Sequence, residues 1–250
     1  MNYADIKTID IQDGEGVRVS IYVSGCHFHC KGCHNQVAWD FNYGKKFDDS
    51  TIDYILDQMN HDYIAGLSIL GGEPLELVNQ QGLVDLVKKV KDKYPEKTIW
   101  CYTGYDFEKD VLGNMYKKYS YTQDLLKNID IIVDGEFEEQ NKIVDLKFRG
   151  STNQKKIDVQ ASLKLGKAVA LKFGDEERYE QKEKTKTPKV IFFKEFEKDS
   201  SEENTKESAT TISIPFINEN IAEIKPAIEV QEVKEKIAAE TINNKEAIKL

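Results

Sequence analysis

Three cysteines in one short segment are the residues of this 250-residue chain that are best suited to chemistry. Cys26, Cys30 and Cys33 follow the pattern C-x3-C-x2-C directly after an apolar run, 17–23, that predicts a strand. Thiolates are the ligands that iron-sulfur clusters require, and a 4Fe-4S cluster has four irons to hold. Three protein ligands would therefore leave one iron open to a small molecule.

Histidines in the same segment make zinc an alternative metal for this site. A zinc site of Cys3His type could take His27, His29 or His34 as its fourth ligand, although structural zinc sites usually join two ligand pairs from separate turns. A ferredoxin that only carries electrons would need a fourth cysteine as ligand. The remaining cysteine, Cys101, lies in a predicted interior strand, and we expect it to be a small core residue.

The charge balance and the N-terminus exclude several classes of protein. The chain has 35 Lys and Arg against 44 Asp and Glu, a formal net charge of -9, which argues against binding to nucleic acid. Residues 1–10 lack the pattern of a secretory signal, and no apolar run approaches the length of a membrane span. Because clustered cysteines also make a poor disulfide framework, we expect a cytoplasmic protein that does not bind a membrane.

Alternating strands and helices predict an α/β fold with a parallel sheet, in which ligands bind at the carboxyl ends of the strands. The alternation ends near residue 173, whereas a closed eightfold barrel typically needs roughly 200 or more residues. We therefore expect an open or partial parallel β/α barrel. After an extended arm and turn over 5–16, the predicted elements are strands 17–23, 67–70, 98–102 and 129–134, helices from Asp48 to about 59 and 80–93, helical stretches 106–119 and 122–127, a last strand after the polar loop 148–160, and a further strand around 168–173.

The composition changes after residue 173. Residues 174–210 are rich in charged and small polar side chains, apart from an apolar island at 190–193, and an amphipathic run follows from about 230. We expect a functional domain over 1–173 and a charged, flexible, largely irregular extension of unknown role over 174–250.

The chain resembles the activating proteins of anaerobic ribonucleoside-triphosphate reductase, a family within the radical S-adenosylmethionine superfamily. The resemblance covers residues 1 to about 173 and is carried by the cysteine pattern after the first strand of the predicted parallel sheet and by Gly71-Gly72-Glu73-Pro74 after the second. Gly32 departs from the superfamily, which has an aromatic residue there, and Glu15 stands where the family usually has proline. Further matching segments are 13–20, 24–26, 33–35, 70–75, 100–105, 133–135 and 149–154.

This resemblance implies a 4Fe-4S cluster on the three cysteines and S-adenosylmethionine on its open iron. Glu73 would accept a hydrogen bond from the amino group of that cofactor, and Arg149 to Gln154 would clamp a peptide or the cofactor's carboxylate, unless they form a simple capped turn. No catalytic residue is expected beyond the cluster and cofactor. The residues expected to contact the cofactor are Gly32, Cys33, His34, Gly71, Gly72, Glu73, Pro74, Tyr102, Thr103 and Gly104.

The implied activity is that of an oxidoreductase that generates glycyl radicals. One electron delivered to the cluster would cleave the cofactor and give a 5′-deoxyadenosyl radical, which removes hydrogen from a glycine of the large subunit of the reductase. The implied partners are that subunit and an electron donor such as flavodoxin. Two alternatives remain open: an activase for another glycyl-radical enzyme of the pyruvate formate-lyase type, and a non-enzymatic Cys3His zinc interaction module.

Overall fold

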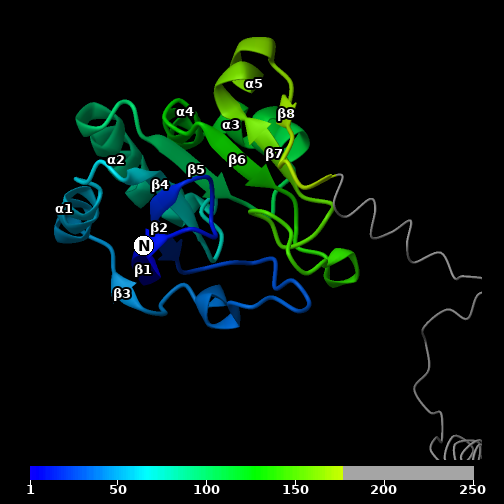
Figure 1. Cartoon of the computed structure of the whole chain (residues 1–250), viewed down its shortest axis with the longest axis horizontal. Helices are drawn as coiled ribbons and strands as arrows, with labels where there is room; N and C mark the ends of the chain where they lie inside the picture. Colours follow the sequence, from blue (N-terminus) through cyan, green and yellow to red (C-terminus); the bar gives the residue numbers. More distant parts are fainter. Residues whose placement is uncertain (177–250) are drawn as a thin grey trace, which may run out of the picture. The chain divides into compact units, whose positions relative to one another are not determined.

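The computed structural model describes residues 1–176, which all lie in the first of two units, Met1–Pro188 and Lys189–Leu250 (Figure 1). The apolar island at 190–193 and the amphipathic run from about 230 lie outside the described residues. The elements are β1 Asn2–Asp10, β2 Val17–Val23, β3 Lys45–Lys46, α1 Asp49–Gln58, β4 Ile64–Gly71, α2 Leu77–Lys93, β5 Thr98–Tyr102, α3 Tyr116–Lys118, α4 Ser120–Leu126, β6 Ile131–Asp134, β7 Lys155–Asp158, α5 Val159–Leu165 and β8 Ala170–Leu171.

The described strands form one open sheet in the order β3-β1-β2-β4-β5-β6-β7-β8. Its centre, β2-β4-β5-β6, is parallel, as the alternation of strands and helices predicts. Both sides are antiparallel: β1 pairs with β2 and β3 at one side, and β7 pairs with β6 and β8 at the other. The expectation of a parallel sheet is therefore correct for four strands and wrong for the rest. For β7 the reason is that the loop after β6 returns the chain alongside β6 without a crossover helix.

Alternation along the strands separates two faces of the sheet. Val19, Ile21 and Val23 of β2 are fully buried in the main hydrophobic core with apolar side chains of α1, α2 and α4, which lie along one side of the sheet (Figure 1). The intervening residues of β2, among them Arg18 and Tyr22, must point to the opposite face because side chains alternate along a strand. The polar pocket and the candidate site described below involve this opposite face.

Local sequence signals set some of the helix ends. The carboxylate of Asp48 accepts from the backbone of Thr51 and caps α1, as predicted. Helix α2 begins at Leu77, three residues before the predicted start, and the stretch predicted as a helix from 106 is π-helical over Phe107–Met115. Cys101 is 1% exposed in β5, which confirms it as a core residue. No helix within residues 1–176 is long and apolar enough to cross a membrane.

The folded part of the chain extends past residue 173. Phe173 is buried and packs with Trp100 and Val133 in a second, smaller apolar cluster. Arg149 lies over the ring of Phe173, at 4.0 Å from its centroid, and pairs with Asp175 at 2.9 Å. The side chain of Arg149 is only 1% exposed and its guanidinium is used inside the fold, whereas the role of the segment 149–154 as a ligand clamp stays a prediction.

Candidate iron-sulfur site

The cysteine segment begins where β2 ends, and the turn after β4 holds it in place. The N–H of Gly72 donates to the carbonyl of Val23 at 2.7 Å, and the N–H of Glu73 donates to the carbonyl of Gly25 at 2.8 Å. On its other side the segment is bound by the residues that follow it, since Cys26 donates its N–H to the carbonyl of Trp39 at 3.1 Å. The two motifs found in the sequence are thus joined by backbone hydrogen bonds at the carboxyl ends of neighbouring parallel strands.

The three cysteines of this segment are free thiols. Cys26 is buried, and Cys30 and Cys33 are half-buried. Burial raises the pKa of the Cys26 thiol to about 11, and the charge of Glu73 adds to the shift. Burial also raises the pKa of the Cys30 thiol to about 11, together with the charge of Glu136. A cluster that binds here therefore has to displace thiol protons.

The donor set fits an iron-sulfur cluster in its chemistry, because three thiols within one segment are the ligands that such clusters take. Within residues 1–176, no three Cys, His, Asp or Glu side chains lie close enough together to hold a metal ion. The thiols therefore have to turn toward one another as a cluster binds. The loop histidines have other neighbours: His27 Nδ1 lies 2.8 Å from Glu76 Oε1, and His29 lies against Trp39 with ring centroids 4.5 Å apart.

The two glycines after β4 leave no room for side chains. Gly71 has a φ of 111°, which favours glycine, and a Cβ atom there would lie 2.7 Å from the backbone of Tyr22. A Cβ atom on Gly72 would lie 2.6 Å from the carbonyl oxygen of Gly25. The glycines thus let the turn after β4 approach the end of β2 closely.

Glu73 fastens this turn to the end of β5. Its carboxylate accepts from Leu75 N–H, from the Thr103 hydroxyl and from Gly104 N–H, each at 2.8 Å. The residue is 1% exposed, and burial raises the pKa of its carboxyl to about 7 although these three hydrogen bonds lower it. Protein donors take three of the acceptor positions of Glu73, and an ionised carboxylate offers about four.

Two further loops contact the cysteine segment. The ring of Phe28 packs edge-on against Tyr105, with centroids 4.8 Å apart, and a Cβ atom on Gly104 would lie 2.8 Å from it. From the loop after β6, Glu139 pairs with Lys31 at 3.2 Å. The segment is therefore enclosed by the loops that follow β4, β5 and β6.

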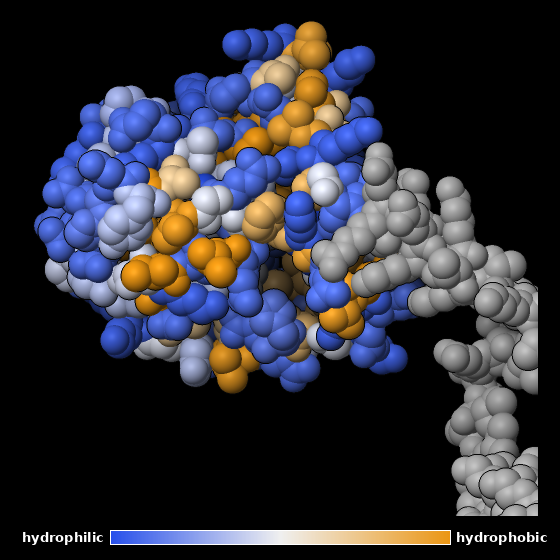
Figure 2. Space-filling view, in the orientation of Figure 1, coloured by the Kyte–Doolittle hydropathy of each residue, from blue (hydrophilic) through white to orange (hydrophobic). Residues whose placement is uncertain are grey.

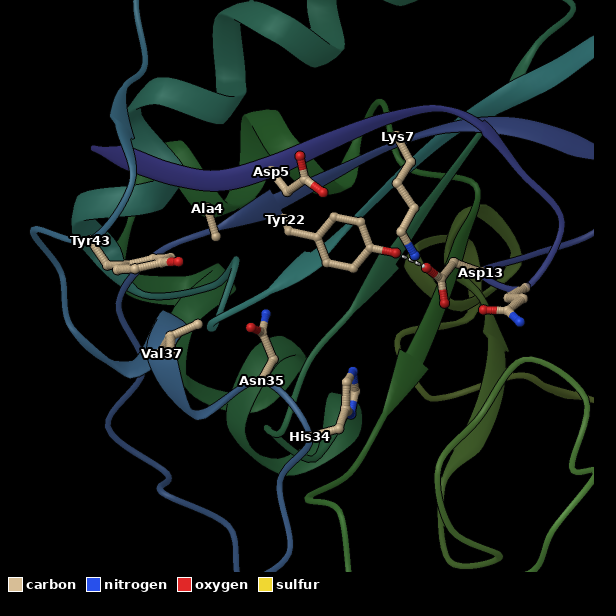
Figure 3. A pocket seen from close by; sticks show the side chains of 10 residues that line it. Ala4, Asp5, Lys7, Asp13, Tyr22, His34, Asn35, Val37 and Tyr43 are labelled. Carbon is tan, nitrogen blue, oxygen red and sulfur yellow. Dashed lines mark hydrogen bonds between the residues drawn. The ribbon is translucent and has the colours of Figure 1, made fainter.

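A polar pocket of about 470 Å³ lies beside the segment (Figure 3). Asp13 and Tyr22 form one wall and His34 and Asn35 lie opposite, with the remaining lining from β1, from Gln12 in the turn after β1, and from the segment that contains Val37 and Tyr43. The space-filling view, in the orientation of Figure 1, shows a mostly hydrophilic face with several hydrophobic groups and a hollow near its middle (Figure 2).

The wall of the pocket contains a hydrogen-bonded group of two carboxyls and a phenol. The Tyr22 hydroxyl lies 2.5 Å from Asp13 Oδ2 and 3.2 Å from Asp10 Oδ2, so its single proton is donated to the nearer Asp13. Burial, together with the neighbouring Asp10, raises the pKa of Asp13 to about 6. Burial also raises the pKa of Tyr22, whereas hydrogen bonds outweigh burial at Asp10 and keep its pKa below the ordinary value. The pair thus retains a proton that an exposed aspartate would lose.

The predicted cofactor residues fall in two places. Glu73, Thr103 and Gly104 are joined by hydrogen bonds, with Gly71, Gly72 and buried Pro74 in the same turn, and Tyr102 lies just before with a buried hydroxyl that has no hydrogen-bond partner among residues 1–176. The others belong to the cysteine segment, where His34 lines the polar pocket, Gly32 lies against Glu139, and Cys33 between them is half-buried.

Several residues at the site have no sequence signal that predicts them. Asp10 and Tyr22 meet Asp13 only because β1 and the turn after it fold beside β2. Asn79, which contacts both motifs, lies one residue before the predicted start of its helix.

Comparison with known proteins agrees with this site. A family profile described as "4Fe-4S single cluster domain" matches residues 12–157. The chain is similar to proteins named "Anaerobic ribonucleoside-triphosphate reductase-activating protein". It is 37% identical over 156 residues to that of Haemophilus influenzae, which spans 62% of this chain and 96% of the relative. It is 37% identical over 155 residues to that of Enterobacteria phage T4, with 62% and 92% covered, and 34% identical over 156 residues to that of Escherichia coli K12, with 62% and 96% covered.

Proposed function

The chain belongs to the family of anaerobic ribonucleoside-triphosphate reductase-activating proteins, and from this membership we propose that it is a radical S-adenosylmethionine activase that generates a glycyl radical on its reductase. The observation that carries the proposal is the pair of backbone hydrogen bonds joining the cysteine segment to the Gly-Gly-Glu turn at the carboxyl ends of β2 and β4. In this proposal the four parallel strands are the core of the superfamily's partial barrel.

Cys26, Cys30 and Cys33 would hold a 4Fe-4S cluster with one iron open. When bound and reduced, the cluster supplies the electron that cleaves the sulfonium C–S bond of S-adenosylmethionine, leaving methionine and the 5′-deoxyadenosyl radical that removes a hydrogen atom from glycine. The work of the protein is to bind, to orient and to exclude water. The close approach at Gly71 and Gly72 lets backbone groups reach the amino acid end of the cofactor.

In this proposal Glu73 receives the ammonium group of the cofactor. Its carboxylate is buried and oriented by Leu75, Thr103 and Gly104, so it loses little freedom when a ligand binds. A buried carboxylate whose pKa lies near 7 gains an ionised partner when an ammonium group arrives, which favours its charged form. Phe28 packs against Tyr105, next to Gly104, whose N–H donates to Glu73.

The substrate partner in this proposal is the large subunit of the anaerobic ribonucleoside-triphosphate reductase. The electron donor is a small redox protein such as flavodoxin, and the free cysteines suit a cytoplasmic location.

The decisive experiment supplies iron and sulfide to the full chain without oxygen, reduces it, and adds S-adenosylmethionine with the reductase. We expect 5′-deoxyadenosine and a glycyl-radical signal in electron paramagnetic resonance spectra of the reductase. A fully loaded, homogeneous cluster that yields neither product would refute the proposal. A radical on pyruvate formate-lyase but not on the reductase would assign the chain to the other class of activase, and a colourless protein with one zinc per chain would favour the interaction module.

A further inference from the structure

Asn79 is a buried amide in the first turn of α2. It is 1% exposed, whereas its neighbours Leu77 and Val78 are 44% and 48% exposed. Asparagine is a poor helix former, and an amide is costly to bury without hydrogen bonds. An apolar side chain would satisfy the packing at this position, so the amide calls for a polar role.

The amide group of Asn79 donates to two backbone carbonyls. Its Nδ2 atom lies 3.0 Å from the carbonyl oxygen of Ser24 and 2.9 Å from that of Glu73. Carbonyl oxygens only accept hydrogen bonds, so the nitrogen, and not the oxygen, of the amide must face them. The Oδ1 atom is buried and has no hydrogen-bond partner within residues 1–176. The two N–H groups of the amide, and not its oxygen, therefore explain why asparagine occupies this position.

These two carbonyls belong to the two segments that form the candidate site. Ser24 ends the link from β2 to the cysteine segment, two residues before Cys26, and Glu73 is the acidic residue of the Gly-Gly-Glu turn. One amide nitrogen between the two carbonyls sets the distance between the segments. Asn79 is itself held in place, because it lies in a helix of 17 residues that packs in the main core.

We propose that Asn79 is a positioning residue for cofactor cleavage, which holds the cysteine segment and the Gly-Gly-Glu turn at the separation that binding of S-adenosylmethionine requires. It acts through Ser24 and Glu73 and does not itself touch the cofactor. The inference rests on the proposed function, because it explains the hydrogen bonds of Asn79 to the two segments by their role in binding S-adenosylmethionine.

The neighbouring residue offers a matched control. Gln80 is fully buried in the same turn of α2 and also makes two side-chain hydrogen bonds, donating to the carbonyl of Leu75 at 2.7 Å and accepting from the Thr122 hydroxyl at 2.6 Å. Neither bond reaches the cysteine segment, whereas Leu75 lies in the turn after β4, so the two variants are compared by exchange in the peptide 22–26. Gln80→Leu therefore removes as many buried hydrogen bonds as Asn79→Leu, with the same kind of cost to folding.

The test compares Asn79→Leu, Asn79→Ser and Gln80→Leu with the unaltered full-length protein. Serine keeps one donor, so Asn79→Ser can satisfy only one of the two carbonyls and serves if the leucine variant fails to fold. The first measurement is hydrogen exchange without iron, for peptides covering 22–26 and 71–75. The second is the dissociation constant of S-adenosylmethionine, from the change that it causes in the paramagnetic resonance spectrum of the reduced cluster.

We expect both Asn79 variants to exchange faster in the two peptides and to bind S-adenosylmethionine roughly tenfold or more weakly, with Gln80→Leu within about twofold of the unaltered protein. Equal affinities in the Asn79 and Gln80 variants would overturn the inference and reduce Asn79 to a structural residue. If the unaltered protein with a full cluster shows no response to S-adenosylmethionine, the proposed function itself fails, and the inference fails with it.

Discussion

The four cysteines of this protein lie in different surroundings. Cys101 is enclosed by the apolar core, whereas Cys26, Cys30 and Cys33 lie in the segment bound to the Gly-Gly-Glu turn. The pKa of Cys101 is raised well above its ordinary value by burial, which suits an inert thiol. The role of each cysteine therefore follows from its position in the fold and not from its residue type.

Replacing any one of Cys26, Cys30 and Cys33 by serine should prevent assembly of a stable 4Fe-4S cluster, because a ligand is lost. Cys101→Ala should retain the cluster and cost about 1 kcal/mol of stability through the small cavity that it leaves. Iron and sulfide content, absorbance spectra and thermal unfolding of the reconstituted variants check both statements. A Cys101 variant that loses iron while one of the three serine variants keeps a full cluster would contradict this assignment of ligands.

The carboxyl pair in the wall of the polar pocket should make stability depend on pH. Asp13 has a pKa of about 6 in the folded protein against an ordinary value of 3.8. Between these values the unfolded chain loses a proton that the folded chain keeps, so stability falls as pH rises from about 4 to about 6, by at most about 3 kcal/mol.

Asp13→Asn should reduce this fall by the part that is due to Asp13, because an amide accepts from Tyr22 and donates to Asp10 as a protonated carboxyl does. The raised pKa of Glu73 continues to lower stability as pH rises to about 7. Urea unfolding between pH 4 and pH 7 measures the effect, and Asp5→Asn, at an exposed position of β1 beside the same pocket, is the control. An unchanged fall in the Asp13 variant would mean that another group is responsible.

At the scale of elements, β2, β4 and β5 bring their C-terminal turns to one place, and glycines set how closely these turns approach. A Cβ atom on Gly72 would lie 2.6 Å from the carbonyl oxygen of Gly25 and 2.8 Å from that of Ala38. Both obstacles are backbone atoms and cannot rotate away.

Gly72→Ala should therefore separate the turn after β4 from the cysteine segment, lower stability by about 1–3 kcal/mol and reduce iron retention. Gly166, at the C-terminal end of α5, is the matched control: it has a φ of 67° but nothing within 4 Å of a Cβ atom. Gly166→Ala should cost about 1 kcal/mol of backbone strain and leave iron content unchanged. Similar iron losses in both variants would show that general destabilisation, and not the site, is being measured.

The whole molecule raises the question of where the functional domain ends. The sequence predicts a boundary at 173, but the ion pair of Arg149 with Asp175 and the hydrogen bond from Lys147 N–H to the carboxylate of Asp175 bring two further residues into the fold. We propose that the domain includes them and that residues 177–250 are not needed for cluster binding.

A chain that ends after Glu176 should assemble the cluster and unfold at the temperature of the full-length domain. A chain that ends after Phe173 should be less stable by roughly 3–5 kcal/mol, because Arg149 loses its buried ion pair with Asp175. Thermal unfolding and iron content of the two truncated proteins make the comparison. Loss of the cluster in the longer one would assign residues 177–250 a role in the site.

The sequence by itself determined the features that depend on neighbouring residues. Spacing predicted the three cysteine ligands, apolar patterning placed β2 and β5 at their residues, and Asp48 marked the start of α1. Only the tertiary structure decided the features that depend on residues far apart in the chain. The antiparallel sides of the sheet, the bonds from Asn79 to Ser24, and the pairing of Arg149 with Asp175 each depend on which segments come to lie side by side. A local pattern states which element a residue belongs to, but a polar side chain finds its partner through the packing of the whole chain.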